Sequence, residues 1–183
     1  EIRLYLSEFY QKDLDKLKLY AEELPLKPLY SFEPRLREAL QKKVWLKSGA
    51  SLVIEPTEAL TVIDVNTGKA VKGRGRGEDY FLKINLEAAK EIAYQIRLRN
   101  LSGIILVDFI DMEEKASDEI LLQTLKEYLA ADPIKTTFVD MTPLHLVEIT
   151  RKKVRRPLYE EGFERGMEND KDERDAASNA SGN

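Results

Sequence analysis

The sequence predicts an α/β fold of mixed (α+β) character, in which helices flank a central mixed β-sheet. Three observations support this prediction: strand-like segments alternate with helical ones, two segments carry apolar residues at helical spacing, and Gly103 to Phe109 is a continuous apolar run. Such a run is typical of a central strand covered on both faces. A chain of 183 residues with 43% hydrophobic content can bury one core of ordinary size, so we expect one main domain.

The expected helices and strands follow from the spacing of apolar residues and from the positions of Pro and Gly. Residues 16–20 alternate like a half-buried strand, and the helix expected after Pro34 is short and amphipathic. Asn85 is the expected cap of a later helix. The remaining expected elements are strands at 44–46, 51–54 and 59–65, a helix at 86–99, a strand at 103–109, a helix at 117–130, and strands at 136–139 and 144–149.

Charge is distributed unevenly, although the formal net charge is only -4. Four cationic residues and no acidic one lie between Lys69 and Arg76, and five of the six positions from Arg151 to Arg156 are Lys or Arg. After Tyr159 the chain is acidic and lacks apolar periodicity, so we expect disorder there. The predicted organisation is an appendage at 1–39, the main domain at 40–159 and a disordered acidic tail at 160–183.

The chain contains no cysteine, which excludes disulfides, thiolate metal sites and a cysteine nucleophile. It has neither an apolar run of about 18 residues nor a signal pattern at its N-terminus. We therefore expect a soluble, cytoplasmic protein without a membrane partner. Because the first residue is Glu1 and not Met, we also expect the chain to derive from something longer or processed.

Two aspartates lie near the ends of two predicted strands. The segment from Leu60 to Phe109 reads strand, connection, helix, strand, which favours a parallel pair with a right-handed crossover. Such a pair places Asp64 and Asp108 at one edge of the sheet, and strand alternation puts Asn66 on the face of Asp64.

A carboxylate within an apolar strand is costly unless something pairs with it. A hard divalent cation, magnesium or manganese, shared by Asp64 and Asp108 satisfies both. The alternative is that each aspartate only caps the following turn, and the pattern alone favours the two interpretations equally. Asp111 is either a supporting carboxylate or a cap of the loop before the next helix.

At these positions the sequence resembles the ribonuclease E/G family, in order from about Asp13 to Leu158. The residues that carry the resemblance are Val44-Trp45-Leu46-Lys47-Ser48-Gly49, Ile54-Glu55-Pro56-Thr57-Glu58-Ala59-Leu60-Thr61, Ile63-Asp64-Val65-Asn66-Thr67-Gly68, Asn85-Leu86-Glu87-Ala88-Ala89, Arg97-Leu98-Arg99-Asn100-Leu101, Asp108-Phe109-Ile110-Asp111-Met112 and Val147-Glu148-Ile149-Thr150-Arg151-Lys152.

The resemblance implies a DNase I-like catalytic subdomain at 40–159, preceded by a partial RNase H-like segment at 1–39. It implies that Asp64 and Asp108 bind magnesium and that Asn66 orients the second carboxylate. The metal would polarise a scissile phosphate and activate water for in-line attack. The implied activity is endonucleolytic cleavage of single-stranded, AU-rich RNA to 5'-phosphate and 3'-hydroxyl ends, in RNA processing and decay.

The sequence departs from the family pattern in three respects. It lacks the OB-fold RNA-binding domain and the 5'-monophosphate pocket with which members usually open. It has the acidic tail in place of the paired-cysteine zinc link, so no zinc is expected, and a homo-oligomer would have to form without that link. Pro143 and His145 stand where a basic residue and a glycine are expected; for His145, packing or turn placement is the expected role.

Several basic residues are candidate RNA contacts. The glycine-rich arm containing Lys72, Arg74 and Arg76 is either a phosphate-tracking segment or a solvated connection. The remaining candidates are Arg97, Arg99, Arg151 and Lys152, for which RNA contact and a solvated face are equally favoured. The leading hypothesis is a magnesium-dependent endoribonuclease core; the alternative is a non-catalytic RNA-binding or assembly module that keeps the family fold.

Overall fold

The computed structural model describes residues 2–67 and 77–160, and the chain divides into two compact units, residues 1–38 and residues 39–183. The expected boundary lay one residue later, between residues 39 and 40. The candidate RNA contacts Lys72, Arg74 and Arg76 and the acidic tail after Glu160 lie outside the described residues. Each unit is described by itself.

The described residues of the first unit form short helical elements, the last of which ends one residue beyond the unit boundary. They are α1 (Ile2–Phe9), the 3-10 helix η1 (Gln11–Lys16), α2 (Leu26–Leu29) and α3 (Phe32–Ala39). The prediction of a half-buried strand at 16–20 is wrong: η1 ends at Lys16, and Leu19 is 95% exposed. Alternation stabilises a strand only when a sheet is present to pair with it, and none of the described strands lies in this unit. The expected helix is confirmed, with Pro34 in its first turn.

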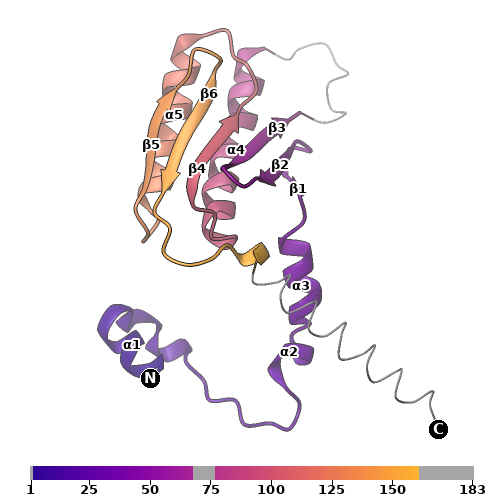
Figure 1. Cartoon of the computed structure of the whole chain (residues 1–183), viewed down its shortest axis with the longest axis vertical. Helices are drawn as coiled ribbons and strands as arrows, with labels where there is room; N and C mark the ends of the chain where they lie inside the picture. Colours follow the sequence, from indigo (N-terminus) through magenta and orange to yellow (C-terminus); the bar gives the residue numbers. More distant parts are fainter. Residues whose placement is uncertain (1, 68–76, 161–183) are drawn as a thin grey trace, which may run out of the picture. The chain divides into compact units, whose positions relative to one another are not determined.

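The second unit is built on a six-stranded mixed sheet with the order β1-β2-β3-β4-β6-β5 (Figure 1). Its strands are β1 (Lys43–Trp45), β2 (Ser51–Pro56), β3 (Leu60–Asn66), β4 (Gly103–Asp108), β5 (Thr136–Met141) and β6 (Leu146–Arg151). Only β3 and β4 pair in parallel; the other neighbours are antiparallel. The predicted mixed sheet is confirmed, and β4 is a central strand.

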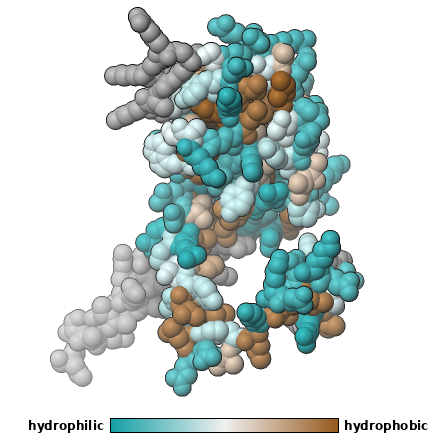
Figure 2. Space-filling model, turned by 180° about the vertical axis from the view of Figure 1, so that it is seen from behind, coloured by the Kyte–Doolittle hydropathy of each residue, from teal (hydrophilic) through white to brown (hydrophobic). Residues whose placement is uncertain are grey.

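Two helices, α4 (Glu78–Leu98) and α5 (Lys115–Ala130), pack against each other on one face of the sheet (Figure 1). They lie on the same face because the two crossovers, β3 to β4 and β4 to β5, step across the sheet in the same direction and share the usual right-handedness. Seen from the helical side, the surface of this unit is largely hydrophilic, with apolar side chains in scattered groups (Figure 2).

The core lies between this sheet face and the helices. Its fully buried members include Leu52 and Ile63 from the sheet and Ile92 and Leu125 from the helices. Neither α4 nor α5 covers the opposite sheet face, and Ile104 on that face is 50% exposed. The expectation that residues 103–109 are covered on both faces is therefore wrong. We call the uncovered side the open face.

The helix α4 begins at Glu78, well before the expected start near Leu86. Its first turns pack Tyr80, Phe81 and Leu82 against the core. These three apolar residues are consecutive, so they do not produce a helical period. The expected cap Asn85 lies inside the helix and is fully buried. Within the described ranges, neither this helix nor any other is long and apolar enough to cross a membrane.

Candidate active site

The parallel pairing of β3 with β4 places Asp64 directly beside Asp108, because the two residues are partners in the register. Neighbouring strands lie about 4.8 Å apart, and register partners point to the same face. That face is the open one: Ile63 and Val107, the preceding residues, are completely buried on the helical side. Two aspartates that are 44 positions apart in the sequence, 64 and 108, thus lie together at an uncovered edge.

Asn66 joins this pair from the end of β3. Its side-chain amide donates a short hydrogen bond to Oδ2 of Asp64. Residues two apart in a strand share a face, so this contact follows from the local backbone. The bond restrains the Asp64 carboxylate in one orientation and leaves the other oxygen, Oδ1, for a further ligand.

The surroundings of Asp108 raise its affinity for protons. Burial raises the pKa of Asp108, and the negative charges of Asp64 and Asp111 raise it further. Asp111 follows β4 in an exposed loop, and the helix α5 begins later, with Glu114 as its N-cap residue. Asp111 is therefore not the helix cap; its charge acts on Asp108 and strengthens the attraction of this edge for cations.

The donor set at this edge is small. Among residues 2–67 and 77–160, no group of three or more histidine, cysteine or carboxylate side chains is arranged to hold a metal ion. The pair of Asp64 and Asp108 nevertheless fits magnesium, which commonly binds one or two carboxylates and completes its shell with water and substrate phosphate. Both groups are hard oxygen donors, and their mutual repulsion is of the kind that a divalent cation relieves.

Asn85 positions the loop that follows β4. Its Nδ2 donates to the carbonyl of Ile110 at 2.8 Å, and its Oδ1 accepts the N–H of Ile110 at 3.0 Å. This two-way contact ties the middle of α4 to the residues between Asp108 and Asp111. The sequence did not reveal this contact, because Asn85 stands just before the predicted helix at 86–99 and was expected only to cap it. A buried amide at this position is costly unless it is paired, as it is here.

Replacement of Asn85 by alanine is expected to lower the free energy of unfolding by about 1–3 kcal/mol, because both backbone groups of Ile110 lose their partner in a buried setting. Urea unfolding followed by circular dichroism measures the change. Gln123→Ala, which removes an exposed hydrogen bond to Glu127, is the matched control and should change the free energy by less than about 0.5 kcal/mol. Equal midpoints for the two variants would contradict this role of Asn85.

Glu78 holds the other end of the same loop. Its carboxylate accepts a hydrogen bond from the Ser117 hydroxyl and from the backbone N–H groups of Glu113 and Glu114. These bonds lower the pKa of Glu78. A side chain from the start of α4 therefore satisfies donors at the start of α5. The sequence pattern provided no sign of this contact, since a glutamate in the first turn of a helix is common.

The candidate RNA contacts differ in accessibility. Arg97 and Lys152 are exposed. Arg99 is only 3% exposed, and its guanidinium donates to Oε1 of Gln95 and to the carbonyl of Gln41. Burial lowers the pKa of Arg99. Its side chain is used inside the protein, and the expected RNA contact does not apply to it.

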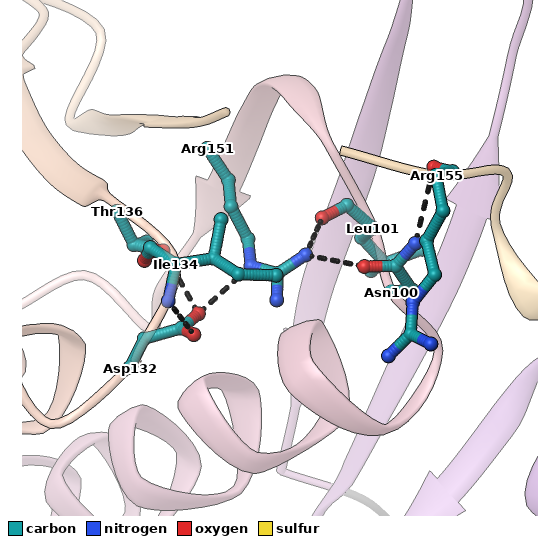
Figure 3. A network of polar contacts seen from close by, with 7 residues as sticks. All are labelled: Asn100, Leu101, Asp132, Ile134, Thr136, Arg151 and Arg155. Atoms are coloured by element: carbon teal, nitrogen blue, oxygen red, sulfur yellow. Dashed lines mark hydrogen bonds and ion pairs between the residues drawn. The ribbon is translucent and has the colours of Figure 1, made fainter. Parts of the chain in front are cut away.

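Arg151 is also buried, with 4% of its surface exposed, and forms an ion pair with Asp132 (Figure 3). Its Nη1 donates to Oδ1 of Asn100 and to the carbonyl of Leu101. The alternation of β6 places Arg151 on the helical side with Ile149 and Val147. The basic run at 151–156 thus begins with a structural residue. Among its cations, only the exposed ones after Arg151 can contact RNA.

His145 occupies the tight turn between β5 and β6. Its backbone has a φ of 59°, in the left-handed region that favours glycine, and its N–H donates to the carbonyl of Thr142. This conformation explains why a glycine would suit the position. Burial raises the pKa of nearby Asp118, His145 opposes this shift, and the charges of Glu78 and Asp111 add to it. Pro143 is exposed in the same turn.

Comparison with known proteins agrees with the geometry. The model of the Ribonuclease E/G family matches residues 1–154. Ribonuclease G of Haemophilus influenzae is 44% identical over 158 residues, which are 86% of this chain and 32% of that protein. Ribonuclease E of a Nostoc species is 42% identical over 141 residues, covering 77% of this chain and 20% of that protein. A chloroplastic Ribonuclease E/G-like protein of Arabidopsis thaliana is 38% identical over 156 residues, which are 85% of this chain and 16% of that protein.

The chain thus spans at most about a third of the length of these curated relatives. The family match nevertheless covers most of the chain, from the first residue to beyond the last strand of the sheet. This chain therefore belongs to the ribonuclease E/G family.

Proposed function

We propose that this chain is the catalytic core of a magnesium-dependent endoribonuclease that cleaves single-stranded RNA. The observation that carries the proposal is the register pairing of Asp64 with Asp108 on the open face, with Asn66 bonded to Asp64. The names of its relatives, ribonuclease G and ribonuclease E, support RNA as the substrate. In keeping with the resemblance, we further propose a cytoplasmic role in RNA processing and decay, on AU-rich segments.

Asp64 and Asp108 would hold the cation, and Asn66 would keep the Asp64 carboxylate in its binding orientation. When bound, magnesium supplies a Lewis acid that neutralises charge on a phosphate and favours attack by water. Manganese suits the same hard donors. The negative charge of Asp111 beside Asp108 favours cation binding at this edge. The proposed products carry 5'-phosphate and 3'-hydroxyl ends.

RNA would lie along the open face. The exposed cation Lys152 is available for its phosphates, and so by sequence are Lys72, Arg74 and Arg76 on the connection directly after β3. Arg97 is exposed on α4, on the helical side, so it is available to RNA that continues around the edge of the sheet. Such contacts with phosphate contribute affinity without sequence preference.

Cleavage of a fluorescent single-stranded RNA during a magnesium titration tests the proposal. We expect cleavage to rise with magnesium concentration, to stop in excess EDTA and to return when magnesium or manganese is added. Enzymatic ligation of the downstream product to a 3'-hydroxyl acceptor should succeed without prior phosphorylation, since that product carries a 5'-phosphate. Cleavage that continues in EDTA, or products with a 5'-hydroxyl, would refute the mechanism.

A non-catalytic RNA-binding or assembly module is the second candidate. It is favoured by the absence, among residues 2–67 and 77–160, of a group of three or more side chains arranged to hold a metal ion. Binding that weakens steeply with salt, without magnesium-dependent cleavage, would support this alternative over the first.

A further inference from the structure

An exposed tryptophan shares the open face with the aspartates. Trp45 in β1 is the register partner of Ser51 in β2, which in turn is the partner of Asn66 in β3. Trp45 therefore lies in the same row as Asn66, two strand spacings or about 10 Å away. It is 65% exposed, although tryptophan is usually well covered in proteins.

A lysine lies directly over this ring. Nζ of Lys43 is 4.0 Å from the ring centroid of Trp45. Lys43 belongs to the neighbouring row of the open face, because it pairs with Val53 and Val53 pairs with Asp64. An aromatic surface and a cation thus lie together at the edge strand, level with the aspartate site.

Trp45 also borders a hollow of about 600 Å³ that runs between the end of β1 and the helices α4 and α5, on the helical side of the sheet. A second exposed aromatic residue, Tyr94, lines it at 50% exposure. Three cations line it as well: Lys47, Lys90 and Arg97. Two aromatic surfaces and several positive charges therefore surround one continuous depression.

The acids of this hollow are occupied by other partners. Glu87 accepts hydrogen bonds from the backbone N–H groups of Lys47 and Ser48, and Glu91 accepts one from the side-chain amide of Gln95. Within residues 2–67 and 77–160, none of the ion pairs involves a cation of the hollow. The positive charges are consequently available to an anionic ligand.

The chemistry of this surface matches a single-stranded nucleic acid. Every base has a flat face that stacks on an aromatic side chain, while nearby cations attract the phosphates. A duplex keeps its bases stacked on one another and offers no such face. An apolar protein partner would leave the cations without counterions.

We propose that Trp45, on the edge strand, stacks on a base of the RNA substrate, and that the single strand passes from the aspartate site on the open face around this edge into the hollow that Trp45 shares with Tyr94 and Arg97 on the helical side. This inference rests on the proposed function for the identity of the ligand. It adds a substrate-positioning surface on the edge strand, outside the metal site.

Because Trp45 is the only tryptophan of the chain, its fluorescence reports on this residue alone. The full chain is titrated in EDTA, which prevents metal-dependent cleavage, with a single-stranded RNA of adenosine and uridine. We expect quenching of Trp45 emission that saturates together with the fluorescence anisotropy of the labelled RNA. The same RNA annealed to its complement should quench little, and inorganic phosphate should not quench. Anisotropy that rises without quenching, equal quenching by the duplex, or no binding at all would overturn the proposal.

Variants separate stacking from charge. Trp45→Ala should weaken RNA binding roughly tenfold, whereas Trp45→Phe, which retains an aromatic ring, should weaken it about twofold. Arg97→Ala should weaken binding and reduce its salt dependence, whereas Lys135→Ala, at an exposed position before β5, is the matched charge control. Equal affinities of the Trp45→Ala and Trp45→Phe proteins would also overturn stacking.

Failure of this inference is distinguishable from failure of the proposed function. Binding in EDTA and quenching of Trp45 do not depend on cleavage. If quenching occurs as expected but magnesium supports no cleavage, the stacking surface stands and the catalytic proposal fails. If cleavage depends on magnesium but Trp45 emission does not respond to RNA, the catalytic proposal stands and the stacking surface fails.

Discussion

Asp64→Asn and Asp108→Asn are each expected to reduce magnesium-dependent RNA cleavage by at least about a thousandfold, since metal stabilisation of charge is worth several kcal/mol and each 1.36 kcal/mol is a factor of ten. The two carboxylates are register partners, and replacement of either one halves the charge available to the cation. Single-turnover cleavage of a fluorescent RNA at saturating protein measures the loss in the chemical step.

Glu148→Gln provides a control on the same surface. Glu148 pairs with Leu106 in the sheet, so it shares the open face but lies two residues before the aspartate edge along β4. Its replacement also removes one carboxylate charge and should change the rate by less than about threefold, as expected for long-range electrostatics screened by salt. Circular dichroism should show that all three variants are folded. A folded Asp64→Asn or Asp108→Asn protein with unchanged turnover would end the assignment of the metal site.

Replacement of Asp132 by alanine is expected to lower the free energy of unfolding by about 3–5 kcal/mol, because it leaves the Arg151 guanidinium buried without its counterion. Both side chains of this ion pair are only 3% exposed. Oδ2 of Asp132 also accepts from the Thr136 hydroxyl, and Oδ1 accepts the N–H of Ile134 (Figure 3). Thermal and urea unfolding of the full chain measure the effect.

The paired variant Asp132→Leu with Arg151→Met is the control for this prediction. It removes both charges and fills the site with apolar groups, so its stability should lie within about 2 kcal/mol of the unmodified protein. If Asp132→Ala and the paired variant were equally unstable, the loss would arise from packing and not from an unpaired charge.

Stability should also depend on pH through Asp132. Burial by itself raises the pKa of Asp132, but hydrogen bonds from Arg151, Ile134 and Thr136 outweigh it, and the pKa in the folded protein is lowered. The contribution of the charged form is therefore complete above the unfolded pKa of about 3.9 and is lost as the pH falls through the lower folded pKa. Urea midpoints measured from pH 6 down to pH 3 should fall more steeply for the unmodified protein than for the paired variant. Parallel curves would contradict this linkage.

Most elements of the second unit follow from local patterns. Alternation and helical periodicity report how each segment buries one face, which is why the strands β1 to β6 and the helix α5 lie close to their predicted ranges. Local patterns fail where apolar residues are consecutive, as at Tyr80 to Leu82, or where no partner strand exists, as at residues 16–20. The extended start of α4 and the irregular first unit were therefore missed.

The convergence of Asp64 and Asp108 was predictable because a strand-helix-strand segment has one favoured handedness, and parallel strands end at the same edge. The supporting contacts were not predictable. Asn85 was expected to cap a helix, yet it bonds to the backbone of Ile110, and Glu78 satisfies donors at the start of α5. Both contacts depend on how α4 packs beside the loop after β4.

The sequence by itself determined the order of the strands and helices in the second unit, the mixed sheet and the pair of aspartates, because these features depend on periodicity within a segment and on the handedness of a single crossover. Only the tertiary structure decided which charged and aromatic side chains face solvent. Within basic segments that look uniform in the sequence, Arg99 and Arg151 are buried while Arg97 and Lys152 are exposed, and Trp45 stands uncovered on the open face. The physical reason is that burial is set by contacts between residues distant in the chain, such as Arg151 with Asp132, and those contacts exist only once the sheet and helices have packed.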